Sequence, residues 1–269
     1  MDLQKYGPWA LIIGGSEGIG ESFARKLAAD GFKLALIARR LGPLNALADD
    51  LRSQGAEVRT ASVDMTEPDA LEQVRMVTDD IEIGLLIFNA GVVVGGPQGF
   101  INQSRDTYRR FLALNVHGHA DFSHHYGGLM CARGRGGIIL IGSTGSFMGS
   151  PGLPPIYCGA KAFSRIFSEG IWQEMEKDGV DVLHFCVDYT DTPTNQRQGL
   201  QLAHAQSSDS AAQQALDNIA NGPIVIAGGQ QQYDGAAQRS LLPGRAEAVR
   251  AADIEAVWHI GRPTPGEGN

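Results

Sequence analysis

The chain has 269 residues, of which 43% are hydrophobic and 19% charged, with 35 Gly against 12 Pro and a net charge of −8. This composition is typical of a folded, turn-rich globular protein, and the negative charge argues against a nucleic-acid partner. The apolar runs are far shorter than the ~18 residues of a membrane-spanning helix, so no membrane partner is expected. The three cysteines have no C-x-x-C spacing and the N-terminus has no secretion-signal pattern, which favours a cytoplasmic protein.

Apolar runs and helical periodicities alternate along the first third of the chain. Four runs have the length and composition of buried strands: residues 9–13, 33–38, 57–63 and 83–88. Helices are expected between them. The first runs from Ile19 to a stop at Gly31, the second stops at Gly55, and the third begins at Thr66, where Thr-Glu-Pro-Asp is typical of a capped helix start.

The alternation continues through the second half. Further strands are predicted at residues 138–141, 180–187 and 223–227, and further helices at about 104–131, 160–177 and 246–258. Together the elements predict one Rossmann-like domain over residues 1–269, an αβα sandwich with a doubly wound, mostly seven-stranded parallel sheet. Residues 190–222 are more polar, and we expect them to cover a substrate; residues 261–269 are expected to form a frayed tail.

A glycine-rich turn follows the first predicted strand, with Gly at positions 14, 15, 18 and 20. Its spacing differs from the G-x-G-x-x-G of long dehydrogenases. Glycine nevertheless lets the backbone approach a pyrophosphate closely, and the helix from Ile19 directs its N-terminal amides at the phosphates. The turn therefore predicts a dinucleotide site, with a ligand-free glycine turn as the alternative.

Arginines follow the second predicted strand, which ends in Ala38-Arg39-Arg40. An acidic residue at such a position accepts hydrogen bonds from the ribose of NAD, whereas a 2′-phosphate calls for cationic donors. The sequence here favours NADP(H). Two solvated arginines at a helix start are the alternative.

Tyr157 and Lys161 are four residues apart, and Ser143 stands at the end of a predicted strand. On a helix, positions i and i+4 share a face, so the Lys161 ammonium can lie near the Tyr157 phenol. A neighbouring cation lowers the pKa of a phenol from about 10, which makes tyrosine a usable general acid or base.

These segments, in this order, resemble the short-chain dehydrogenase/reductase family, in its short, single-domain, NADP-preferring form. The resemblance runs from about residue 8 to 193 and includes the glycine turn, Asp64-Met65, Asn89-Ala90-Gly91, Asn115, Ser143, Tyr157 and Lys161. It implies an oxidoreductase that interconverts a ketone or aldehyde and an alcohol by hydride transfer. NADP(H) is the preferred cofactor and NAD(H) is possible.

The resemblance also implies the role of each catalytic residue. Tyr157 exchanges a proton with the substrate oxygen, and Ser143 hydrogen-bonds that oxygen. Lys161 lowers the pKa of Tyr157 and binds the nicotinamide ribose, while Asn115 holds a water that links Lys161 to solvent.

Residues from all these segments are implied to hold the cofactor: Gly14, Ser16, Glu17, Gly18, Ile19, Gly20, Arg39, Arg40, Asp64, Met65, Asn89, Ala90, Gly91, Tyr157, Lys161, Thr190 and Thr192. The substrate is expected to be a small apolar carbonyl compound or alcohol. Six apolar residues in loops suggest this: Phe147, Met148, Leu153, Ile156, Leu200 and Leu202. A homodimer or homotetramer is the implied assembly.

Some positions depart from the family pattern. Ile13 replaces a threonine whose hydroxyl ties the glycine turn to a neighbouring strand. Ser143 precedes Tyr157 by one residue more than usual, so Thr144 is an alternative for the serine role. Val187-Asp188 replaces a Pro-Gly pair, and Thr190 replaces a branched aliphatic residue beside the nicotinamide.

The sequence also allows functions other than that of a reductase. A catalytically weak NADP(H)-binding scaffold or sensor is the main alternative. An epimerase or dehydratase is disfavoured, because those chains have a longer C-terminal part. A zinc site is also disfavoured, although four residues share one predicted helix face: His117, Asp121, His124 and His125. No metal is expected, and a subunit interface accounts better for these histidines.

Overall fold

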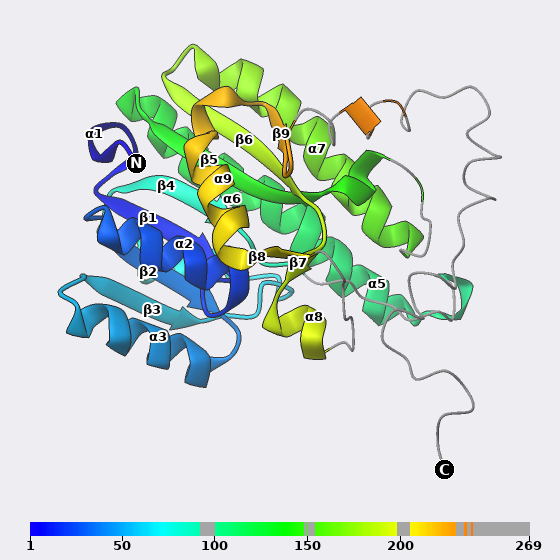
Figure 1. Ribbon diagram of the computed structural model, residues 1–269, viewed down its shortest axis with the longest axis horizontal. Coiled ribbons are helices and arrows are strands. Elements are labelled where there is room, and N and C mark those ends of the chain that lie inside the picture. Colours follow the sequence, from blue (N-terminus) through cyan, green and yellow to red (C-terminus); the bar gives the residue numbers. More distant parts are fainter. Residues whose placement is uncertain are drawn as a thin grey trace.

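A seven-stranded parallel sheet lies at the centre of the computed structural model, which describes residues 1–91, 100–147, 149, 154–197, 205–229, 234, 235 and 238 (Figure 1). Its order is β3-β2-β1-β4-β5-β6-β9, and all neighbouring strands are parallel. The strands are β1 Trp9–Ile13, β2 Lys33–Ala38, β3 Val58–Ser62, β4 Ile83–Phe88, β5 Gly136–Ser143, β6 Val180–Val187 and β9 Ile224–Ile226. This confirms the predicted doubly wound Rossmann-like sheet.

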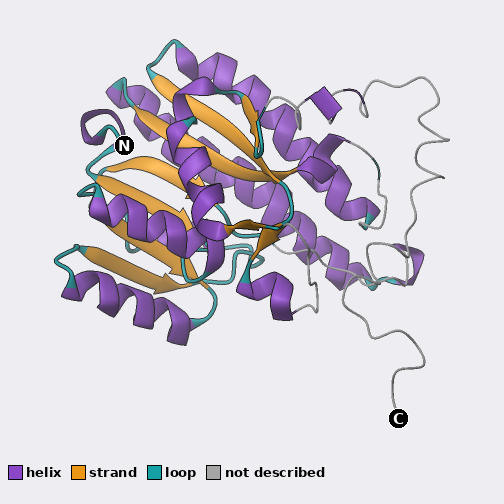
Figure 2. Cartoon of the chain, viewed as in Figure 1, coloured by secondary structure: helices purple, strands orange, loops and turns teal. Residues whose placement is uncertain are grey.

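Helices cover both faces of the sheet and complete three layers (Figure 2). One face carries α2 Gly18–Ala29, α3 Leu41–Ser53 and α9 Ser208–Asp217; the other carries α4 Ala70–Arg75, α6 Gly118–Arg133 and α7 Pro155–Glu176. Successive strand residues point to opposite faces, so Ile12 packs in one apolar cluster and Leu11 in the other. Because both faces are covered, β1 and β4 are buried along their whole length.

Shorter elements lie at the edges of this core. They are α1 Leu3–Tyr6, α5 Arg105–Leu112, α8 Pro193–Arg197 and the two-residue strands β7 Thr190–Asp191 and β8 Gln206–Ser207. Of these, β7, α8 and β8 lie within residues 190–222, which were expected to cover a substrate. No helix among the described residues is long and apolar enough to cross a membrane.

Two predicted helix starts were wrong. The helix expected from Thr66 begins at Ala70 instead, because the Thr66 amide and hydroxyl both bond Asp64 Oδ1, at 3.0 and 2.8 Å, and hold a turn there. The helix expected from residue 160 begins at Pro155, whose fixed backbone angle and missing amide suit a first helical position. Tyr157 and Lys161 therefore both lie on α7.

The single helix predicted over residues 104–131 is interrupted. It starts at α5, capped by Ser104, and passes through a π-helical turn, Ala113–His117, before continuing as α6 to Arg133. Asn115 lies in this turn, and its Nδ2 donates to the Phe111 carbonyl at 3.1 Å. A π turn widens the helix locally and often marks a functional site. The helix predicted at residues 246–258 lies outside the described residues.

Candidate functional site

A cavity of about 650 Å³ lies at the carboxyl ends of the central strands, where the chain winds away from β1 and β4 in opposite directions. Such a position is the usual ligand site of an open parallel sheet. Ten of the predicted cofactor residues line it: Gly14, Ser16, Glu17, Arg39, Arg40, Asp64, Met65, Asn89, Ala90 and Gly91. The structure thus brings together four segments that are far apart in the sequence.

The glycine turn requires glycine for steric reasons. Gly14 has φ +83°, and a Cβ there would lie 2.8 Å from the Ala90 backbone. A Cβ on Gly20 would lie 1.9 Å from the Gly14 carbonyl oxygen, so α2 starts directly against the turn. Gly18, Ile19 and Gly20, at the N-terminus of α2, are not among the residues that line the cavity.

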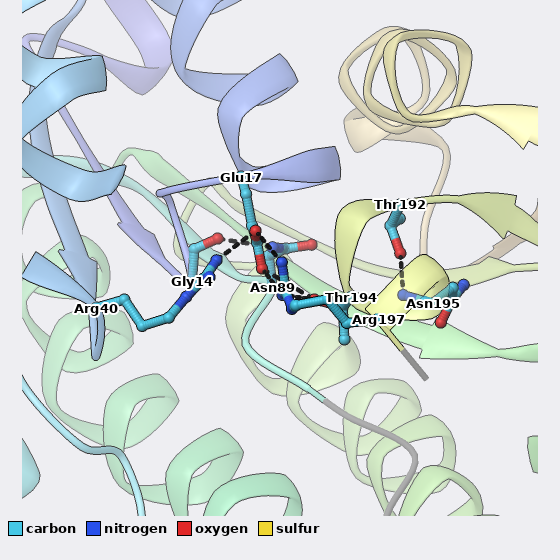
Figure 3. A network of polar contacts seen from close by, with 8 residues as sticks. All are labelled: Gly14, Glu17, Arg40, Asn89, Thr192, Thr194, Asn195 and Arg197. Carbon is cyan, nitrogen blue, oxygen red and sulfur yellow. Dashed lines mark hydrogen bonds and ion pairs between the residues drawn. The ribbon is translucent and has the colours of Figure 1, made fainter. Parts of the chain in front are cut away.

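Backbone hydrogen bonds hold the turn in place despite Ile13. The amides of Gly14 and Gly15 donate to the Ile37 carbonyl at 2.7 and 3.1 Å. Asn89 and Ala90 donate their amides to the Ile13 carbonyl, and Asn89 Nδ2 donates to the Gly14 carbonyl at 2.9 Å (Figure 3). The hydroxyl missing at position 13 is therefore replaced by contacts from β2 and from the end of β4.

Glu17 lies at the centre of an ion-pair network (Figure 3). It pairs with Arg40 and Arg197 and accepts a hydrogen bond from the Thr194 hydroxyl at 3.0 Å. Chiefly through the hydrogen bonds from Arg197, and against the effect of burial, the pKa of Glu17 is lowered to about 2. Glu17 is thus ionised at neutral pH and paired with the guanidinium groups of Arg40 and Arg197.

A second ion-pair cluster lines the cavity around Asp64. Arg110 Nη2 donates to Asp64 at 2.9 Å, and Arg39 approaches the same carboxylate only to 4.0 Å. Burial opposes ionisation of Asp64, but the hydrogen bonds from Thr66 and the nearby arginines lower its pKa overall. The Arg39 side chain is 71% exposed and has no closer acidic partner among the described residues, so its donors face solvent beside the cavity.

The predicted catalytic residues adjoin the cavity at Gly91. A Cβ on Gly91 would lie 3.4 Å from Lys161 Nζ and 3.7 Å from Asn115 Oδ1, so these two polar atoms flank the same point. Phe111, a cavity-lining residue, packs against the Tyr157 ring with centroids 6.0 Å apart. Both contacts place the catalytic residues directly beyond the cofactor-sized cavity.

Ser143, at the end of β5, lies close enough to Tyr157 to lower the pKa of its phenol, and Ser143 Oγ accepts from the Gly145 amide at 3.1 Å. Both are buried, with 8% and 9% of their surfaces exposed. Thr144 instead directs its hydroxyl toward Asp188, at 3.4 Å. The geometry therefore favours Ser143 over Thr144 as the partner of Tyr157, in spite of the unusual spacing.

Lys161 is buried and donates from Nζ to the Ile141 carbonyl at 3.0 Å, with Nζ 5.9 Å from the centre of the Tyr157 ring. Burial lowers the pKa of Lys161 to about 8. The expected lowering of the Tyr157 pKa is not found, because burial raises it to about 12 against the effect of the Ser143 hydrogen bond. Tyr157 is a neutral phenol at pH 7 in this environment.

Asn115 has an unsatisfied acceptor. Its side chain is fully buried, and Oδ1 has no hydrogen-bond partner in the structure, although Nδ2 is bonded. A buried acceptor next to an ammonium group is a suitable place for a bridging water, which needs two to four polar partners.

Thr190 and Thr192 follow β6, and of the two Thr192 contacts the glycine turn. Thr192 touches the Gly18 position, where a Cβ would lie 3.4 Å from the threonine methyl, and its hydroxyl accepts from the Asn195 amide at 3.1 Å (Figure 3). Thr190 is buried and donates to the Asp188 carbonyl at 2.9 Å. Thr192 is therefore beside the predicted phosphate site, whereas the Thr190 hydroxyl is used within its own loop.

Two cavity-lining arginines were missed from the sequence: Arg110 on α5 and Arg197 on α8. Neither adjoins a strand end or a motif, so no sequence signal marks them. Phe147 was expected at a substrate pocket but is buried against Cys186 and Ile226, with Arg165 over its ring. Of the other five loop residues named for that pocket, only Ile156 lies within the described residues.

A buried polar cluster beneath Lys161 was also missed. Ser164 bonds His119 at 2.7 Å and His184 at 3.2 Å, and all three are fully buried. Burial lowers the pKa of His184 to about 3 and that of His119 well below its ordinary value, so both imidazoles are neutral. Over the described part of the chain, no three His, Cys, Asp or Glu residues are placed to hold a metal ion.

Comparison with known proteins places these features in a family. Residues 8–203 match the family model described as short chain dehydrogenase. A very-long-chain 3-oxoacyl-CoA reductase of Neurospora crassa is 33% identical over 195 residues, covering 70% of this chain but only 58% of that protein. A 7β-hydroxysteroid dehydrogenase of Clostridium sardiniense is 31% identical over 192 residues, covering 71% of this chain and 72% of that one.

A solved structure agrees with the sequence relatives. The short-chain dehydrogenase from Sphingobium yanoikuyae in complex with NADPH has a TM-score of 0.77 and 28% identity, covering 97% of this chain and 99% of that chain. The family match covers the glycine turn, the strand-end residues and the Ser143, Tyr157 and Lys161 set. The chain belongs to the short-chain dehydrogenase/reductase family.

Proposed function

We propose that the chain is an NADP(H)-dependent oxidoreductase that interconverts a ketone or aldehyde and the corresponding alcohol. The observation that carries this proposal is the buried set of Ser143, Tyr157 and Lys161 next to the cavity, with Lys161 one helical turn beyond Tyr157 on α7. The names of both sequence relatives describe oxidoreduction at an oxo or hydroxyl group.

Tyr157 is the proton donor in the reductive direction. Its pKa of about 12 keeps the phenol protonated at neutral pH, so it can give a proton to the substrate oxygen as charge develops there. The Ser143 hydroxyl, which lies close enough to Tyr157 to lower its pKa, stabilises the same oxygen. Alcohol oxidation needs the phenolate instead, so we expect its rate to increase with pH.

Lys161 and Asn115 replace the proton that Tyr157 gives up. The Lys161 ammonium can donate because burial lowers its pKa to about 8, close to the pH of the reaction. Asn115 Oδ1 offers an acceptor for a water on the way to solvent.

The cavity suits a dinucleotide, because it lies at the carboxyl ends of the strands and a glycine turn too tightly packed for any Cβ presents its backbone there. When bound, the nicotinamide cofactor supplies or accepts the hydride. The residues that would hold it are the glycine turn, Asp64-Met65, the Asn89–Gly91 segment, Lys161 and Thr192. NADP(H) is favoured over NAD(H) because Arg39 offers exposed donors at the end of β2, as a 2′-phosphate requires.

An apolar ketone or secondary alcohol is the proposed substrate. The two relatives are named for a very-long-chain oxoacyl group and a hydroxysteroid, and both groups are carried on large apolar frameworks. Tyr189, which follows β6 and lies in the segment expected to shape the substrate pocket, presents a 49% exposed ring. This ring can contact such a framework.

A homo-oligomer is proposed, as a homodimer or homotetramer joined through α6 and α7. These helices expose Leu129, Phe163 and Ile166 at 47%, 38% and 55%. Light scattering coupled to size-exclusion chromatography tests this, and a monomeric mass at micromolar concentration would contradict it.

The test of the function is NADPH oxidation by the purified protein with a panel of cyclic and long-chain ketones, including oxosteroids. We expect turnover with at least one apolar ketone and slower turnover with NADH. Calorimetry with NADPH accompanies the assay. Tight binding of NADPH without oxidation across the panel would contradict the reductase and support a binding scaffold or sensor.

A further inference from the structure

Two arginines from distant segments converge on one carboxylate at the edge of the cavity (Figure 3). Arg40 reaches Glu17 from the residue before α3, and Arg197 reaches it from the end of α8. Arg197 Nη1 donates to Oε2 at 2.9 Å, and Nη2 contacts both Oε1 and, at 3.0 Å, the Thr194 hydroxyl. Glu17 thus binds the Arg197 guanidinium through two nitrogens.

The segment that carries Arg197 is held in position on the glycine turn. Thr192 packs against Gly18, and Asn195 Nδ2 donates to the Thr190 carbonyl at 2.8 Å. These contacts do not involve Glu17. Arg197 is therefore placed at the cavity by the local structure of α8 as well as by its ion pair.

Both arginines line the cavity together with Arg39 and Glu17. The three groups Arg40, Glu17 and Arg197 carry two positive charges and one negative charge at neutral pH, since the pKa of Glu17 is lowered to about 2. The cluster has a net charge of +1 and lies beside the exposed guanidinium of Arg39. A cavity wall of this kind attracts an anion with more charge than one carboxylate.

We propose that Arg197 is a second arginine of the 2′-phosphate site, and that Glu17 is an internal anion which holds Arg197 and Arg40 until the phosphate of the cofactor replaces it. This inference rests on the proposed preference for NADP(H). The ligand class is a phosphate monoester on the adenosine ribose of a dinucleotide. Glu17 and Arg197 become selectivity residues, beside Arg39 at the end of β2.

The exchange is favourable for physical reasons. A phosphate monoester carries about −1.5 to −2 charge at neutral pH and presents three acceptor oxygens, whereas Glu17 offers one charge and two oxygens. The arginine side chains are 42% and 48% exposed, so their pairs with Glu17 are screened by water and weak. Because Arg197 stays bound to an anion throughout, α8 remains over the cavity after the exchange.

The experiment compares two small probes by calorimetry with the full-length protein. The probes 2′,5′-ADP and 5′-AMP differ only in the 2′-phosphate, so the ratio of their dissociation constants isolates the phosphate contribution. We expect the wild type to bind 2′,5′-ADP more tightly, and Arg197→Gln to reduce this preference by about tenfold, as for the loss of a charge-assisted bidentate contact.

The Glu17→Gln variant tests the internal anion separately. Removing its charge releases both arginines, so the preference for 2′,5′-ADP should increase by about tenfold or less, while 5′-AMP binding changes little. Controls are Glu21→Gln and Arg25→Gln, which remove the members of an exposed ion pair on α2 whose atoms do not line the cavity. Both controls should leave the preference unchanged, and circular dichroism verifies that each variant is folded.

The outcomes separate this inference from the proposed function. A wild type that binds both probes equally would contradict the NADP(H) preference and this inference together. A wild-type preference that Arg197→Gln leaves intact would overturn the role of Arg197 alone. A weaker preference in Glu17→Gln would show that Glu17 positions the arginines for the phosphate, and would overturn its role as a competing anion.

Discussion

The two ends of the candidate site differ in kind: one carries exposed charged side chains, and the other carries buried polar side chains. At the end proposed to bind the adenosine, Glu17 and Asp64 form ion pairs with four arginines whose side chains are 42–71% exposed. At the catalytic end, Tyr157, Lys161 and Asn115 are each 9% exposed or less, and burial dominates the pKa shifts of Tyr157 and Lys161. Screened charges give modest, salt-dependent contributions to binding, whereas preorganised buried groups can change a barrier by several kcal/mol. Substitutions at the two ends should therefore differ in size and in kind.

The largest effect is expected at Lys161. Lys161→Met removes the buried ammonium that resupplies Tyr157, and we expect kcat for ketone reduction to fall about 1,000-fold. Steady-state kinetics with NADPH measure this. Lys177→Met, an exposed lysine just beyond α7, is the control and should keep wild-type kcat. A Lys161→Met enzyme within tenfold of wild type would contradict the buried proton supply.

The buried histidines should make the fold sensitive to acid. His119 and His184 are neutral in the folded protein, because burial lowers both pKa values, but they bind protons below pH 6.5 when unfolded. The free energy of unfolding should therefore fall as the pH drops from 7.5 to 5.5, by about 3 kcal/mol for the pair.

Urea unfolding at the two pH values measures this loss. His184→Gln should remove about half of it, whereas His124→Gln, at an exposed position on α6, should leave it unchanged. An unaltered pH dependence in His184→Gln would contradict the neutral buried imidazole.

The serine assignment gives a smaller effect with a matched control. Ser143→Ala should lower kcat about 100-fold, because a donor to the substrate oxygen is lost. Thr144→Val, one residue further and directed at Asp188, should stay within a few-fold of wild type. If the two results were reversed, Thr144 would hold the serine role.

The smallest predicted change lies at the exposed end. Arg39→Ala should raise KM for NADPH about tenfold and KM for NADH hardly at all, with kcat unchanged, because we propose that Arg39 binds the 2′-phosphate, which NADH does not have. When the assay is repeated at higher salt, the difference in KM for NADPH between the variant and the wild type should become smaller. Equal changes for both cofactors would argue against recognition of the 2′-phosphate by Arg39.

The sequence was sufficient to predict those features that one short segment determines. The apolar run of β1 is a local property, and it was predicted. The same holds for Tyr157 and Lys161, whose spacing places them on one face of a helix. The glycines of the turn were expected for the approach of the backbone to a ligand, whereas the clash of a Gly14 Cβ with Ala90 depends on the fold. Strand ends meet in any doubly wound sheet, so the adenosine residues also could be assembled in advance.

Long-range contacts could not be predicted in this way. Arg197 is 180 residues from Glu17, and Arg110 is 46 residues from Asp64, so only the folded chain brings their charges together. The neutral state of Tyr157 depends on its burial, which cannot be predicted from the four-residue spacing between Tyr157 and Lys161. The π turn at Asn115 likewise depends on a side-chain bond to Phe111 that competes with the helix backbone.

The most direct test of the central claim is single-turnover ketone reduction by Tyr157→Phe with bound NADPH, followed by loss of nicotinamide fluorescence. Phenylalanine keeps the ring packing against Phe111 but has no proton to give. The account predicts an NADPH dissociation constant within a few-fold of wild type and a hydride-transfer rate at least about 100-fold lower, with Tyr6→Phe at the remote α1 unaffected. A Tyr157→Phe enzyme that reduced the ketone at the wild-type rate would contradict Tyr157 as the acid.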